Sequence, residues 1–75
     1  MNDFRIIARG IDSGNIAAQM EASDFFTANN IYNDYVASYK DAHKVFKLSS
    51  VVVAMLAKRN NSNFEIWDIV KSEIC

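Results

Sequence analysis

The chain contains a single cysteine, Cys75, and a single histidine, His43. A disulfide within the chain is therefore impossible, and a zinc site is not expected because no Cys/His pair has ligand spacing. A domain of 75 residues buries a smaller share of its surface than a larger one, so its core stabilises it only marginally. Without a covalent or metal staple, this chain must rely on an unusually apolar core or on a partner surface. No metal or cofactor is predicted.

Composition and charge limit the partners and the cellular compartment that we expect for this chain. Hydrophobic residues make up 51% of the chain, and eight basic against nine acidic residues leave a net charge of −1. Bulk attraction to nucleic acid or to an anionic membrane is therefore not expected. The longest apolar run, residues 51–57, is too short to span a bilayer, and Asp3 and Arg5 interrupt any leader-like start. We expect one cytoplasmic domain over residues 1–75, without membrane association.

The first third of the chain has the pattern of a β-hairpin. Residues 4–9 alternate Phe4, Ile6 and Ala8 with Arg5, Ile7 and Arg9, which is typical of a strand with one buried face. Residues 11–15 combine Asp, Ser and Gly and predict a turn, in which Gly14 can adopt a positive φ. Residues 16–22 alternate loosely and predict the second strand. The alternative is a helix that begins near Asn15, because Ala, Gln, Met and Glu are good helix formers.

Two helices are predicted next. Ser23 is placed as the N-cap of the first helix, with Asp24 complementing its dipole, and apolar residues then recur every three or four positions up to Tyr39. Lys40-Asp41 predicts a break, after which Asp41 would cap a second helix. Its apolar stripe consists of Val45, Leu48, Val52, Met55 and Leu56. The helix is expected to end at residues 60–63, where Asn suits a C-cap.

The last segment supports two interpretations. Residues 64–70 have the aromatic and β-branched content of a strand, whereas Ser62-x-x-Glu65 matches a capping box that would begin a helix. We favour the strand. The predicted fold is therefore α+β, a small ββααβ domain in which two helices pack on one face of a three-stranded antiparallel sheet. The alternative is an all-α fold.

Aromatic residues supply the candidates for a protein interface. Tyr32, Tyr35 and Tyr39 lie on one predicted helix together with Phe25 and Phe26, which is more apolar surface than one helix face needs. Core packing explains part of this excess, and a partner would explain the rest. In the last strand, Trp67 and Ile69 would point away from the helices. With Ile7 of a neighbouring strand they could form an exposed apolar patch. The alternative is a bulge or a helical turn after Trp67 that rotates these side chains inward.

The candidate nucleic-acid site is a group of lysines. Lys40, Lys44 and Lys47 share a face of the predicted second helix and could neutralise a few phosphates. The simpler interpretation is a solvated helix face. No arginine, which binds phosphate in a bidentate fork, accompanies these lysines.

No catalytic residue is predicted, because the chain contains neither a phosphate-binding glycine loop nor a nucleophile elbow. The expected function is that of a small non-catalytic protein-binding module. The short, asparagine-rich chain suggests a phage or mobile-element accessory protein that inhibits or modulates a host protein by occlusion. The alternative is a small nucleic-acid-binding regulator that uses the lysine face together with Lys58 and Arg59. A homodimer is a further way in which the apolar excess could be covered.

Overall fold

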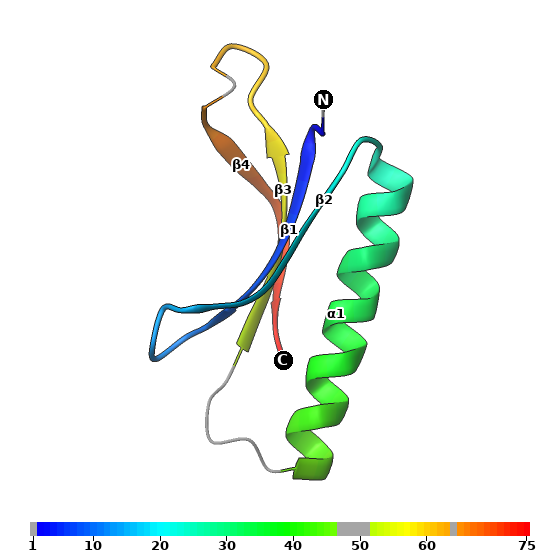
Figure 1. Ribbon diagram of the computed structural model, residues 1–75, viewed down its shortest axis with the longest axis vertical. Coiled ribbons are helices and arrows are strands. Elements are labelled where there is room, and N and C mark those ends of the chain that lie inside the picture. Colours follow the sequence, from blue (N-terminus) through cyan, green and yellow to red (C-terminus); the bar gives the residue numbers. More distant parts are fainter. Residues whose placement is uncertain (1, 47–51, 64) are drawn as a thin grey trace.

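The fold is a four-stranded antiparallel sheet with one long helix on one face (Figure 1). The computed structural model describes residues 2–46, 52–63 and 65–75, with the backbone alone over 43–46. The strand order is β2-β1-β3-β4, so β1 and β3 lie in the centre. The elements are β1 (Phe4–Gly10), β2 (Ile16–Ala22), α1 (Phe25–Phe46), β3 (Val52–Arg59) and β4 (Trp67–Ile74).

The predicted N-terminal hairpin is confirmed. β1 pairs with β2 from Phe4 opposite Ala22 to Arg9 opposite Ile16, with a bulge near Ala8. Gly14 has a φ of 71°, which a glycine adopts without steric cost. The turn closes through a hydrogen bond of 2.9 Å from the Gly10 amide to the Asn15 carbonyl. The alternative helix from Asn15 is therefore wrong.

The helix begins one residue later than predicted, with Asp24 as its cap instead of Ser23. The Thr27 amide and hydroxyl donate to the Asp24 carboxylate at 2.9 and 2.8 Å. These hydrogen bonds satisfy an otherwise free donor of the first turn. The predicted break at Lys40-Asp41 is also wrong, because α1 continues through both residues to Phe46. Neither residue is a helix breaker, and Lys40 is engaged by an ion pair with Glu73 of β4.

The predicted second helix is wrong, because its C-terminal half is the central strand β3. Val52, Ala54 and Leu56 are buried on the helix side, and Val53 and Met55 point to the other side. Valine is stiff at χ1 and packs well on a pleated sheet, which favours a strand. A central strand is apolar on both faces, so its sequence also fits a helical stripe and periodicity cannot separate the two. Leu48 lies outside the described residues, and of Val45 only the backbone is described.

The asparagine-rich segment that was predicted to end this helix instead connects β3 to β4. Asn60 accepts from the amides of Ser62 and Asn63 at 2.8 and 2.9 Å, and it donates to Asp68 at 2.9 Å. Such side-chain bonds to nearby backbone stabilise a turn. The strand prediction for residues 64–70 is confirmed from Trp67 onward, where β4 begins. Residues 65 and 66 precede the strand, and residue 64 lies outside the described residues. With one helix and four strands, both the ββααβ architecture and the all-α alternative are overturned.

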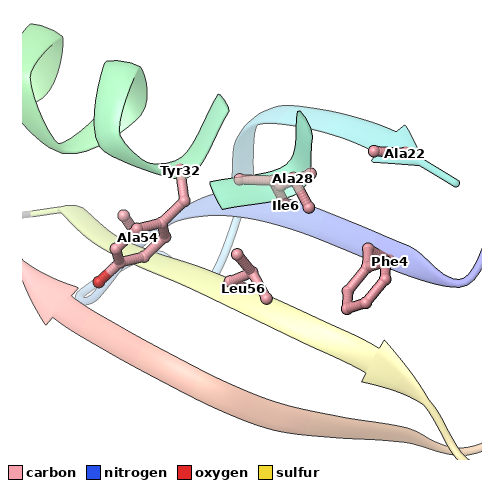
Figure 2. Packing of buried hydrophobic residues seen from close by; sticks show 7 residues of the cluster. All are labelled: Phe4, Ile6, Ala22, Ala28, Tyr32, Ala54 and Leu56. Carbon is pink, nitrogen blue, oxygen red and sulfur yellow. The ribbon is translucent and has the colours of Figure 1, made fainter. Parts of the chain in front are cut away.

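The core lies between α1 and the central strands (Figure 2). Ile6 and Leu56 are its largest fully buried side chains, and small alanines fill much of the remaining space. Tyr32 enters the core from the helix, where 5% of its surface stays exposed. The buried cluster consists of Phe4, Ile6, Ala22, Ala28, Tyr32, Ala54 and Leu56.

Candidate functional site

The side of the sheet that faces away from α1 carries the best candidate site, and we call it the open face. No other described element packs on it (Figure 1). Strand alternation and register place the following strand residues on it: Arg5, Ile7, Arg9, Ile16, Gln19, Glu21, Val53, Met55, Ala57, Arg59, Trp67, Ile69, Ser72 and Ile74.

In strand β4, apolar and polar residues lie on the opposite faces from those expected for a strand with one solvated face. Its open-face residues are mainly apolar, since Trp67, Ile69 and Ile74 lie opposite Arg59, Ala57 and Val53 of β3. Its polar residues Asp68, Lys71 and Glu73 lie on the helix side instead. A strand whose outer face is meant for water normally shows the reverse distribution. The pattern of β4 therefore indicates that the open face is built to be covered.

Exposure values show how much apolar surface is accessible there. Ile69 and Ile74 are 56% and 64% exposed, and the neighbouring Ile7, Val53 and Met55 are half-buried. These five side chains, which we call the apolar patch, extend across β1, β3 and β4. Contiguous exposed apolar side chains mark interaction surfaces more often than isolated ones do.

One end of the open face is ordered by a stack of cationic and aromatic groups. The guanidinium carbons of Arg5 and Arg59 lie 4.4 and 4.3 Å from the centroid of the Trp67 ring. Cation–π contacts of this kind hold long side chains in place. Ala57, which pairs with Arg5 and Ile69 on this face, is only 2% exposed. These side chains therefore form a packed surface instead of projecting separately into solvent.

Charge on the open face is predominantly positive. The chain contains three arginines, Arg5, Arg9 and Arg59, and register places all of them here. Glu21 is the carboxylate among the strand residues of this face, and it forms an ion pair with Arg5 at 3.2 Å. Arg9 is exposed and has no ion-pair partner in the part of the chain that the structure describes. Arg5 and Arg9 were not among the candidates from the sequence, although their alternation with Phe4, Ile6 and Ala8 was a usable signal.

Of the three lysines in the predicted lysine site, the structure describes the side chain of Lys40. Lys40 forms an ion pair with Glu73, and this carboxylate raises the pKa of the Lys40 ammonium through a hydrogen bond and its charge. The side chain of Lys44 and the whole of Lys47 lie outside the described residues. On the same side of the sheet, Lys71 contacts Asn29 and lies 4.8 Å from the centroid of the Tyr32 ring. The described lysines near α1 thus serve to attach β4 to the helix.

The three tyrosines lie along the sheet-facing side of α1. Tyr32 belongs to the core, and its burial raises the pKa of its hydroxyl. Tyr35 packs against the core and contacts Tyr39 edge-on, with ring centroids 6.4 Å apart. Of the five interface candidates from the sequence, Trp67 and Ile69 are the two that the structure brings together on the open face.

Other kinds of site would need a pocket, a group of metal ligands or a reactive thiol. Across residues 2–46, 52–63 and 65–75 there is neither a pocket nor a group of three potential metal ligands. Cys75 is half-buried beside the core, and desolvation raises the pKa of its thiol, which disfavours the nucleophilic thiolate. Within the same ranges, none of the helical structure is sufficiently long and apolar to cross a membrane.

Comparison of the chain with protein-family models, curated proteins and solved structures finds no match in any of the three.

Proposed function

We propose that this protein is a non-catalytic protein-binding module that covers a partner's surface with its open face. The observation that carries the proposal is the inverted pattern of β4, which turns Ile69 and Ile74 outward and its charges toward the helix. A thin core with few large buried side chains gives a second reason. A chain of this size gains stability when a partner removes more apolar surface from water.

The composition of the open face also supports the proposal. Tryptophan, methionine and arginine are enriched at protein interfaces, and lysine is depleted there. Met55 lies in the apolar patch, whereas Trp67 and Arg59 lie at its end. Binding by an extended, shallow face requires no pocket, which agrees with occlusion as the mode of action.

Site-specific photo-crosslinking tests this proposal. A benzophenone amino acid replaces Ile74 on the open face or, as a matched control, Phe26 of α1, which is 75% exposed and lies off this face. In lysate of the native host, we expect nuclease-resistant protein adducts from position 74 and not from position 26. Unlabelled wild-type chain should compete these adducts away, and an Ile69→Ser/Ile74→Ser variant should not.

Two results would contradict the proposal. Equal adduct yields from positions 26 and 74 would show that the open face has no preference for a partner. If the Ile69→Ser/Ile74→Ser variant suppresses adduct formation as well as the wild-type chain does, the apolar patch does not carry binding. Circular dichroism of each variant confirms that the fold is retained.

A further inference from the structure

We infer that the open face recognises an acidic protein surface, in which carboxylates surround an apolar centre. This inference rests on the proposed function and adds the chemistry of the partner. It is carried by the distribution of charge and not by apolar exposure alone.

Cationic residues are distributed by type between the open face and the helix side of the molecule. All three arginines are on the open face, whereas the described lysines are not: Lys58 and Lys71 lie on the helix side of the sheet, and Lys40 lies on α1. Arginine presents a planar fork of donors that binds carboxylates in a bidentate manner and is less strongly hydrated than lysine. A face that needed charge only for solubility would not require this selection.

These arginines lie around the apolar patch. Arg5 and Arg9 flank Ile7 along β1, and Arg59 lies beside Trp67 at one end of the face. A central apolar area with charged groups at its border is the usual arrangement of a protein interface. Since Glu21 is already paired with Arg5, the border offers an excess of positive charge to a partner. Complementary carboxylates would fix the orientation of the bound surface.

The same geometry disfavours two other occupants. Non-specific binding of single-stranded nucleic acid uses aromatic rings on which bases stack, and here two guanidinium groups already lie against the Trp67 ring. The side chains of the apolar patch are aliphatic or thioether groups, which provide no stacking surface. A second copy would bring a face of the same sign, with three arginines and one carboxylate, against itself.

A peptide selection tests the inference. The full chain is immobilised, a displayed library of random peptides is selected on it, and the recovered pool is sequenced. We expect peptides with an aliphatic centre to be enriched, with Asp and Glu above their frequency in the starting library. Binding of one selected synthetic peptide, and of the same peptide with every acidic residue changed to its amide, is then measured through the fluorescence of Trp67, the chain's single tryptophan.

Matched charge variants make the test specific. Arg9→Gln should weaken binding of the acidic peptide about two- to fivefold, as expected for one exposed ion pair, and should leave binding of the amide peptide unchanged. Lys58→Gln removes an exposed charge from the other side of the sheet and should change the binding of neither peptide. Added salt should weaken binding of the acidic peptide alone.

The possible failures are distinguishable. Selected peptides without acidic enrichment, or equal binding of the acidic and amide forms, would overturn the acidic partner and leave the binding module intact. If every recovered peptide binds the Ile69→Ser/Ile74→Ser variant as tightly as it binds the wild-type chain, the proposed function is overturned together with this inference. Tighter binding of an oligo-dT strand than of any peptide, lost in Arg9→Gln, would assign the face to nucleic acid. A dimer by light scattering that dissociates in the Ile69→Ser/Ile74→Ser variant would assign it to a second copy.

Discussion

At the scale of single residues, stability depends on a few side chains. Ile6 and Leu56 come from adjacent central strands, lie opposite each other in the register, and are fully buried beneath α1. Most of their neighbours in the core are alanines, which cannot expand to fill a vacated volume. The loss of one large side chain should therefore leave a cavity.

We expect Leu56→Ala to lower the free energy of unfolding by about 2–5 kcal/mol, because the substitution removes buried methyl groups and leaves that cavity. Met55→Ala is the matched control, since it changes the adjacent residue of the same strand on the open face. Its effect should be clearly smaller. Urea denaturation of both variants gives the comparison, and equal losses would contradict the assignment of the two faces.

Asp24 is the second residue with a specific role, as the N-cap of α1. Hydrogen bonds from the Thr27 amide and hydroxyl lower the pKa of its carboxyl below the ordinary 3.8. A carboxyl with a lowered pKa stabilises the fold above pH 3.8, and this contribution disappears as the pH falls through the lower folded-state pKa.

Asp24→Ala should therefore lower the thermal midpoint at neutral pH, and Asp24→Asn should retain most of the cap because Asn also accepts from the first turn. The difference between wild type and Asp24→Asn should shrink below pH 3.8, where the wild-type carboxyl becomes protonated. Thermal melts as a function of pH check this. A difference that stays constant down to the acid limit would show that the charge of Asp24 makes no contribution.

At the scale of elements, β4 is attached differently from the other strands. β1 and β3 place apolar side chains under α1, whereas β4 reaches the helix through the Lys40–Glu73 ion pair and through Lys71. Polar contacts near the surface contribute less to stability than apolar burial does. β4 is also an edge strand, and a bulge opposite Leu56 and Ala57 interrupts its pairing.

We expect the hydrogen-bonded amides of β4 to exchange with solvent faster than those of β1 and β3, because an edge strand with polar attachments opens locally. Lys40→Ala should accelerate exchange in β4 and leave β2, the other edge strand, unchanged. Hydrogen exchange followed by NMR resolves both strands. Acceleration in neither strand, or the same acceleration in both, would show that the ion pair does not hold β4.

At the scale of the whole molecule, the protein is a thin two-layer structure, 41 × 24 × 16 Å along its principal axes. Its radius of gyration is 12.7 Å, somewhat larger than the roughly 11 Å expected for a compact domain of this length. A single helix covers one face of the twisted sheet (Figure 1). We therefore expect the open face to determine the solubility of the isolated chain.

The Ile69→Ser/Ile74→Ser variant should be more soluble than wild type and bind less of a hydrophobic dye, because it removes the two most exposed side chains of the apolar patch. Since neither side chain is part of the core, its free energy of unfolding should change by no more than about 1 kcal/mol. Phe26→Ser, which removes an exposed aromatic from α1, serves as the control. A large loss of stability in the double variant would mean that the open face is needed for folding.

The sequence by itself determined the elements whose signals are local. The N-terminal hairpin followed from alternation and a glycine turn, the first helix from its three- and four-residue spacing, and the last strand from aromatic and β-branched residues. Placing Trp67 and Ile69 on the same side of the last strand also required only period-two alternation, since successive strand side chains point to opposite faces. That this side faces away from the helix was left open by the sequence.

Tertiary structure decided the rest. The sequence of residues 52–59 fits both an amphipathic helix and a strand that is apolar on both faces. Pairing with β1 on one side and with β4 on the other makes it a strand. The length of α1 was decided in the same way, because Lys40 reaches Glu73 of a distant strand. The open face could be assembled only when the strand order was known. Arg5 is far in the chain from Arg59 and Trp67, and it is the register of three strands that brings them together.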